Sequence, residues 1–136
     1  MLTEKDYCDK DLSLALKEAG YIGQGRCYYD LDKEPNKLRH FGIQVLTTRS
    51  AEALNFVLAV HLYDAQKWLR NTHNLHISTK PYPCEDGLMW MYEIRRFTPY
   101  LVCVIKNKTG FREAEEALSE GIKEEVKILK EDGKAN

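Results

Sequence analysis

The stretch that decides the fold is NLHISTKPYPCEDGLMWMYEIRRFTPYLVCVIK, residues 74–106. Within it, segments 74–80 and 88–96 place apolar or aromatic side chains at every second residue. This period of two is typical of β-strands that have one covered face. The connecting segments PYPCEDG and FTP are short and contain proline, which favours turns. The stretch therefore predicts three consecutive strands, the third over 100–106, in an antiparallel meander.

The third of these strands, YLVCVIK (100–106), is apolar on both faces and rich in β-branched residues. Strands of this kind are typical of the middle of a sheet, where both faces are buried. We therefore expect residues 100–106 to lie inside the sheet, with Cys103 as a packed core thiol.

A helix is expected at each end of the chain. Apolar residues at helical spacing predict a first helix over 4–19, with Thr3 as its cap and Gly20 as its stop. A last helix is predicted from near Phe111 to about Lys130. Its apolar face and its small residues suit close packing against a sheet, and these positions are Ala114, Ala117, Leu118, Gly121, Ile122, Val126 and Leu129.

The region between the first helix and the meander predicts a hairpin followed by another helix. Strands over 25–31 and 38–47 are joined by DKEPNK, whose proline, asparagine and aspartate favour a turn. Residues 50–71 are predicted as one long helix capped by Ser50. Because the first half of this segment is apolar almost all round, a break near His61 is the alternative.

Together these elements predict an α+β fold with the order α-β-β-α-β-β-β-α. The antiparallel sheet would be packed by helices on one side. With 136 residues, 43% of them hydrophobic, the chain is long enough for one core. We therefore predict a single α+β domain over 1–130 and a frayed C-terminal tail over 131–136.

The composition favours a cytoplasmic protein without a membrane partner. The longest apolar run, 56–60, is far shorter than the roughly 18 residues of a membrane span. The opening MLTEKDYCDKD has no apolar signal-peptide core. The four cysteines are widely spaced, and cytosolic thiols stay reduced, so we expect buried free thiols at Cys8, Cys27, Cys84 and Cys103.

The segment KWLRNTHNLHISTKPYPC (67–84) admits two interpretations. His73, His76 and Cys84 resemble three soft metal ligands. The same segment also fits a junction at which a helix ends, with Asn71 or Asn74 suited to a left-handed cap, and a strand begins. We favour the junction, because a spacing of three between a loop residue and a strand residue does not bring two ligands together. No catalytic residue, metal site or cofactor is predicted anywhere in the chain.

The charge distribution suggests one candidate binding surface. The net charge is −1, but residues 26–112 hold thirteen Lys and Arg against eight acids. Sheet faces that carry aromatic rings beside basic side chains can stack bases and hold phosphates. The alternative, which we favour, is that Trp90 and Tyr92 face the core. The candidate surface residues are Lys80, Arg95, Arg96, Tyr100, Lys106, Lys108 and Arg112.

Two segments, AQKWLRNTHNLHI (65–77) and FREAEEALSEGIKEEVKIL (111–129), resemble a group of small uncharacterised α+β proteins from gut Bacteroidetes genomes, phages and conjugative elements. The opening DYCDKDLSLALKEAGY (6–21) is also similar to that group. The resemblance implies an α+β fold and a mobile-element setting, and it supplies no activity. The layout over 58–130 is also similar to double-stranded-RNA-binding domains and to antitoxins of the HicB type.

From these observations we expect a non-enzymatic accessory or regulatory protein that binds another protein. A homo-oligomer formed through a sheet edge is part of that expectation, because exposed strands invite pairing. The alternative is a nucleic-acid-binding module that uses the basic and aromatic meander. An enzyme is the third hypothesis, and it requires a pocket that joins His73 or His76 to a cysteine or a carboxylate.

Overall fold

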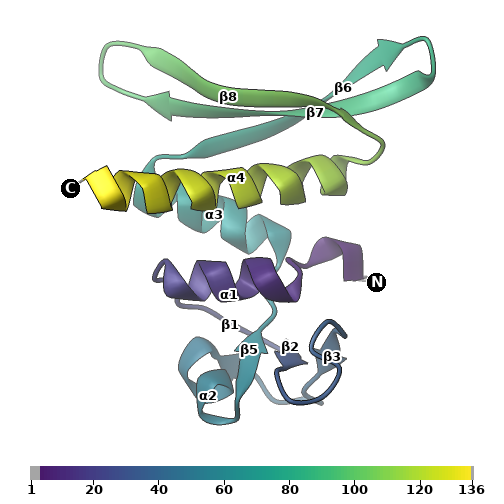
Figure 1. Ribbon diagram of the computed structural model, residues 1–136, viewed down its shortest axis with the longest axis vertical. Helices are drawn as coiled ribbons and strands as arrows, with labels where there is room; N and C mark the ends of the chain where they lie inside the picture. Colours follow the sequence, from purple (N-terminus) through teal and green to yellow (C-terminus); the bar gives the residue numbers. More distant parts are fainter. Residues whose placement is uncertain (1–3, 136) are drawn as a thin grey trace. The chain divides into compact units, whose positions relative to one another are not determined.

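The computed structural model describes residues 4–135, and the side chains of residues 4–133. It contains helices and antiparallel sheets packed against them, which confirms the predicted α+β class (Figure 1). The chain divides into two compact units, Met1–His61 and Leu62–Asn136, and each unit is described by itself. The single domain over 1–130 stays a prediction. Within the described residues, no helix combines the length and the apolar character needed to cross a bilayer.

The first unit begins with a short 3-10 turn, η1 (Glu4–Asp6), and the helix α1 (Lys10–Glu18). The prediction of one helix over 4–19 is therefore wrong at its start. Asp9 interrupts it, because its side chain accepts a hydrogen bond from the backbone N–H of Leu12 at 2.8 Å and caps α1. The predicted cap Thr3 lies outside the described residues. The predicted stop is confirmed, since Gly20 has φ +102°.

The strands of the first unit are short and form two small sheets. β1 (Gln24–Gly25) pairs with β4 (Leu46–Thr47). β2 (Cys27–Asp30) pairs antiparallel with β3 (Arg39–His40), as the predicted hairpin requires, and on its other side with β5 (Phe56–Leu58). The predicted strand over 38–47 is split into β3 and β4. A turn containing Gly42, at φ +62°, separates the two pieces.

The single helix predicted over 50–71 is wrong. The segment forms α2 (Thr48–Ala53), the strand β5, and α3 (Leu62–His73). Thr47, rather than Ser50, caps α2, and the two side chains form a reciprocal capping box. Asn55 then takes a left-handed conformation with φ +57°, which ends the helical path and turns the chain into β5.

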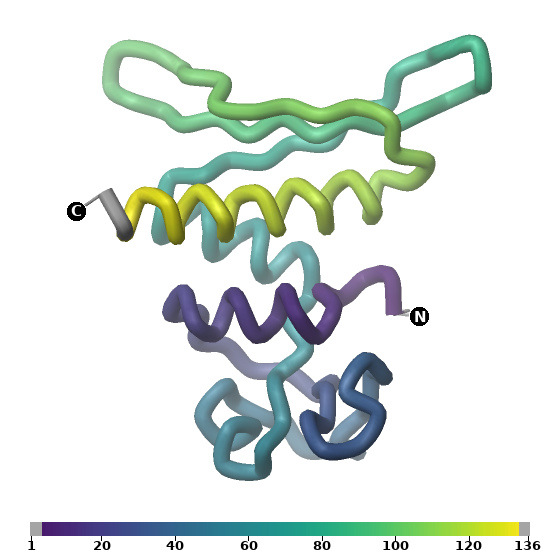
Figure 2. The backbone as a smooth tube through the Cα atoms, in the orientation of Figure 1, coloured from purple at the N-terminus to yellow at the C-terminus, as the bar shows by residue number. Residues whose placement is uncertain are grey.

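The second unit contains the predicted meander. β6 (His76–Cys84), β7 (Gly87–Phe97) and β8 (Val102–Phe111) form one antiparallel sheet in the order β6-β7-β8. The helices α3 and α4 (Ala114–Ala135) lie against one face of this sheet (Figure 1). We call this the helix-covered face and the opposite one the outer face. The two hairpin turns lie at opposite ends of the sheet (Figure 2).

The last helix packs closely on the sheet because of one glycine. A Cβ atom at Gly121 would lie 1.9 Å from Cδ1 of Ile77 and 3.2 Å from Cγ of Tyr92. Residues Leu118, Ile122 and Val126 of the predicted apolar face are buried. The helix begins three residues after the predicted start, because β8 continues to Phe111.

The helix α4 also includes residues 131–135, five of the six in which a frayed tail was predicted. The Arg96 guanidinium on β7 donates a hydrogen bond of 2.6 Å to the Asp132 carboxylate, and this contact holds the last turn to the sheet. Fraying itself stays a prediction, and Asn136 lies outside the described residues.

The prediction for the third strand of the meander is wrong. β8 lies at the edge of the sheet rather than in its middle, and residues Val102–Gly110 are all exposed. The prediction of four buried thiols is wrong for Cys84 and Cys103, which are exposed. Cys8 and Cys27 are buried as expected. An apolar strand gives no indication of its place in a sheet, because that place depends on which strand comes to lie beside it.

Candidate functional site

The structure separates the three residues that resembled metal ligands. His73 ends α3, whereas His76 and Cys84 stand at opposite ends of β6, roughly 25 Å apart along an extended strand. The two histidines each have a local contact: His73 packs edge-on against Trp68, and the Nε2 atom of His76 lies 2.8 Å from the Oδ1 atom of Asn74. Within residues 4–135, no three His, Cys, Asp or Glu side chains are grouped so that they could hold a metal ion.

The junction around His76 is ordered by hydrogen bonds. Asn74 takes a left-handed conformation with φ +54°, one of the caps that the sequence suggested, and its Nδ2 atom donates to the Phe97 carbonyl at 2.7 Å. The His76 ring packs edge-on against Phe97 on the outer face. Burial, and secondarily the nearby Arg70 charge, lowers the pKa of His76 below its ordinary value. This pKa shift favours the neutral form of the imidazole, which packs against Phe97.

The basic residues of the candidate binding surface do not gather on one face of the sheet. Arg96, Lys106 and Lys108 point to the helix-covered face. There Arg96 pairs with Asp132, and the Nζ atom of Lys106 donates to the Glu124 carboxylate at 2.8 Å. This hydrogen bond raises the pKa of Lys106.

The remaining candidates are spread over the rest of the second unit. Arg95 lies on the outer face, where it pairs with Glu93, and Lys80 lies on the same face near the other end of β6. Tyr100 is 94% exposed in the β7–β8 turn, and Arg112 follows β8. Binding by these seven residues stays a prediction.

The most unusual surface of the molecule is the free edge of β8, which sequence reasoning missed by placing this strand inside the sheet. β8 pairs with β7 on one side, and within the described residues no strand pairs with its other side. The half nearest the turn is apolar and exposed: Val102 is 51% exposed and Val104 is 53% exposed. Leu101 and Ile105 extend this exposed apolar surface. Monomeric proteins usually protect long apolar edges, so this edge is a candidate interaction surface.

The second half of the same edge has a different character. Lys106 and Lys108 stand there, and charged side chains, lysine above all, are a common means of preventing unwanted strand pairing. We call residues 100–105 the apolar half-edge and 106–110 the lysine half-edge. A partner strand is therefore expected on residues 100–105.

The apolar half-edge continues onto the outer face of the sheet. The strand register places the side chains of Phe97, Val102 and Val104 on this face, and Met89 and Met91 lie farther along β7 on the same face, beyond Arg95 and Glu93. Phe97 is 43% exposed, and the two methionines are half-buried. Methionine side chains adapt to varied partners, which suits a binding surface.

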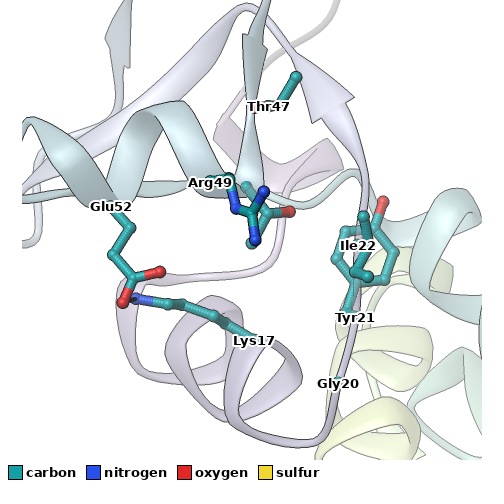
Figure 3. Close-up of a pocket in the computed structure, with 8 residues that line it drawn as sticks. Lys17, Gly20, Tyr21, Ile22, Thr47, Arg49 and Glu52 are labelled. Carbon is teal, nitrogen blue, oxygen red and sulfur yellow. Dashed lines mark ion pairs between the residues drawn. The ribbon is translucent and has the colours of Figure 1, made fainter.

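The first unit contains a surface pocket of about 600 Å³ between the end of α1 and the start of α2. Figure 3 shows Arg49 between the Lys17–Glu52 ion pair, whose charged atoms are 3.5 Å apart, and Ile22. Thr48 closes one wall by donating its backbone N–H to the Gly23 carbonyl at 3.1 Å. Two cations, one carboxylate and the hydroxyl-bearing residues Tyr21, Thr47 and Thr48 line the pocket, and Lys17 and Glu52 are paired with each other.

One thiol–imidazole contact was also missed by sequence reasoning. Cys27 and His40 are directly opposite each other on β2 and β3, and the Sγ and Nδ1 atoms are 3.4 Å apart. The thiol is only 2% exposed and packs in a core cluster with Tyr29 and Val57. A substrate does not reach a sulfur atom in such a position, so the contact is best explained as packing.

A buried acid is the strongest electrostatic anomaly of the second unit. Glu125 of α4 is fully buried, and neither of its carboxylate oxygens has a hydrogen-bond partner among the described residues. Burial raises the pKa of Glu125 to about 9, so the side chain is neutral at pH 7. It lies on the buried face of α4, beside Ile122 and Val126, and not on the β8 edge.

Compared with protein-family models, with curated proteins and with solved structures, the chain matches none. The resemblances noted for segments 65–77 and 111–129 therefore stay predictions. Any function proposed for the chain comes from the geometry of its own residues, among which the free edge of β8 is the surface best suited to binding.

Proposed function

We propose that this chain is a non-enzymatic accessory or regulatory protein that binds another protein through the apolar half-edge of β8. The observation that carries the proposal is the exposure of every residue from Val102 to Gly110 in a strand that pairs with β7 alone among the strands of residues 4–135. In such a complex the partner adds a strand to the sheet, and backbone hydrogen bonds supply much of the affinity.

The side chains around the edge suit a protein partner. A bound strand would contact Val102 and Val104, and side chains on its outer side would lie near Phe97. Apolar and aromatic residues with few charges are typical of the centre of a protein–protein interface. The Glu93–Arg95 ion pair beside them contributes two charges that cancel.

The same arrangement disfavours the nucleic-acid alternative. Binding to phosphates requires several unneutralised cations on one surface. Arg96 and Lys106 are instead paired with acids of α4, and Lys80 and Arg95 point to the opposite face. We therefore place nucleic acid second and treat it as one outcome of the test.

The cellular setting also belongs to the proposal. We infer a cytoplasmic protein, on the basis of the reduced thiols expected from its cysteine spacing. The mobile-element setting rests only on the sequence resemblance of 65–77 and 111–129.

The test is site-specific photo-crosslinking in cells that produce the protein. A photoreactive residue at position 104 is compared with one at position 127, an exposed position on α4. We expect a protein adduct from position 104 that is absent from position 127 and is lost when Val102→Lys is added. An adduct that disappears on nuclease treatment would establish the nucleic-acid alternative, and no adduct at position 104 would overturn the proposal.

A further inference from the structure

We propose that a second copy of this chain occupies the free edge of β8, antiparallel to it and related by a two-fold axis at Cys103. This inference rests on the proposed function, because it names the partner of the same edge. The pairing would join two three-stranded sheets into one continuous sheet. Such a contact is isologous, since both copies use the same surface.

The backbone N–H and C=O groups along β8 point alternately toward β7 and toward the free side of the strand. The register is regular where Phe97, Arg96 and Arg95 pair with Val102, Cys103 and Val104. At the turn, the N–H of Thr98 donates to the Leu101 carbonyl at 2.9 Å. Successive residues of an antiparallel strand direct their N–H and C=O groups alternately to the two sides. Leu101 and Cys103 therefore face β7, whereas Val102 and Val104 offer their backbone groups to the free side.

A two-fold axis at Cys103 brings together the free backbone groups of Val102 and Val104 from the two copies. It places Val102 of one copy opposite Val104 of the other, so that each valine pair exchanges N–H to C=O hydrogen bonds. The two Cys103 residues then form a close pair without mutual hydrogen bonds, with Cα atoms about 4.5 Å apart. Beyond Val104 the register of β8 shifts at Ile105, so the exposed apolar side chains of Leu101 and Ile105 flank the regular pairs.

Charge disfavours a register centred on the lysine half-edge. An axis at Asn107 would place Lys106 opposite Lys108 of the second copy, and like charges directly opposite each other are destabilising. The axis at Cys103 instead leaves both lysines outside the regular pairs 102–104, and Lys106 keeps its ion pair with Glu124.

The expected dimer is reversible. Pairing along the apolar half-edge covers less area than the roughly 1,600 Å² of a standard protein–protein interface. Monomer and dimer should therefore exchange, with the dimer increasing as the concentration of protein is raised.

The first experiment measures self-association of the purified chain by sedimentation velocity over a range of concentrations. Val104→Lys is compared with Leu88→Lys, which introduces the same charge at an exposed apolar residue of β7, away from the edge. We expect Val104→Lys to weaken self-association by about tenfold or more, because lysine blocks edge pairing. Leu88→Lys should associate like the parent, and circular dichroism checks that both variants are folded.

The second experiment tests the register by mild oxidation with diamide, which takes up two hydrogen atoms as two thiols join in a disulfide. Cys84→Ser leaves Cys103 as the exposed thiol, and Cys103→Ser leaves Cys84. We expect disulfide-linked dimers from Cys84→Ser and none from Cys103→Ser. A monomer at all concentrations, or a dimer insensitive to Val104→Lys, overturns the inference. A protein adduct of another mass in the photo-crosslinking experiment would then leave the proposed function standing, and the absence of any adduct would remove both.

Discussion

β8 and α4 follow each other in the chain. β8 is the edge strand of the sheet and α4 packs on that sheet, yet β8 is exposed to solvent whereas one face of α4 is buried. Along β8, the nine residues Val102–Gly110 are exposed although many are apolar. Along α4, one continuous face is buried, including a carboxylic acid, Glu125, that has no partner among the described residues. The chain therefore buries a charge-bearing group in one element and exposes apolar side chains in the next.

The comparison separates stability from binding. Residues beneath α4 fix the fold of the second unit, because their side chains are removed from water. Residues at the β8 edge contribute little burial, so changes there should alter association and leave folding intact.

Glu125→Gln should remove most of the pH dependence of stability between pH 5 and pH 9. The folded-state pKa of Glu125, about 9, lies above its ordinary value of 4.5, so the folded protein keeps a proton that the unfolded chain releases. Stability from this group is greatest below pH 4.5 and is lost as pH rises toward 9. The loss amounts to about 5 kcal/mol from pH 5 to pH 9, at 1.36 kcal/mol for each pH unit.

The measurement is urea unfolding of the parent and of Glu125→Gln at several pH values. Taking the difference between the two curves cancels the contribution of every other titrating group. Curves that stay parallel from pH 5 to pH 9 would mean that Glu125 has found water or a partner, and the contrast between α4 and β8 would be weakened.

Gly121→Ala should destabilise the second unit, whereas Gly133→Ala should not. Both glycines lie in α4, but a Cβ atom at Gly121 meets Ile77 and Tyr92, whereas a Cβ atom at Gly133 meets nothing within 4 Å. Overpacking costs about 1–3 kcal/mol. At Gly133 alanine should instead stabilise by up to about 1 kcal/mol, because it is the better helix former. Chemical denaturation of both variants checks this, and equal effects would show that the helix does not press on the sheet.

The sequence predicted the parts of the fold that follow from local periodicity. Alternation over 74–96 identified β6 and β7, and the spacing of Leu118, Ile122 and Val126 identified the buried face of α4. Asn74 was foreseen as a left-handed cap because asparagine tolerates that conformation.

Other features could not be predicted because they depend on distant partners. An apolar helix and an apolar strand look alike over a few residues, and the pairing of β5 with β2 decided that Phe56–Leu58 is a strand. The signal for a break was Asn55, which precedes β5 and takes positive φ. The β8 edge was missed for a similar reason: the continuous apolar run Val102–Ile105 indicates apolar surroundings, but it does not indicate whether another strand lies on each side. The buried Glu125 looked like one of many acids in a charged helix.

The smallest predicted effect concerns the contact that joins α4 to the sheet near its end. Arg96 and Asp132 are each about a third to a half exposed, and surface ion pairs of this kind contribute about 0.2–1 kcal/mol. A double-mutant cycle with Arg96→Met and Asp132→Asn should give a coupling energy in that range, and the coupling should decrease at high salt. Arg112→Met, which removes a basic residue outside this pair, serves as the control.

Amide hydrogen exchange measures the local effect of breaking the Arg96–Asp132 ion pair. In Asp132→Asn the amides of the last turn of α4 should exchange faster, while those around Ile122 should stay as protected as in the parent. If the amides of the last turn already exchange fast in the parent, the frayed tail predicted from the sequence is supported. Arg96 would then be an exposed cation without a stable acid partner. Because Arg96 would then be free to meet a phosphate, the same result would also strengthen the nucleic-acid alternative at the expense of the β8 edge.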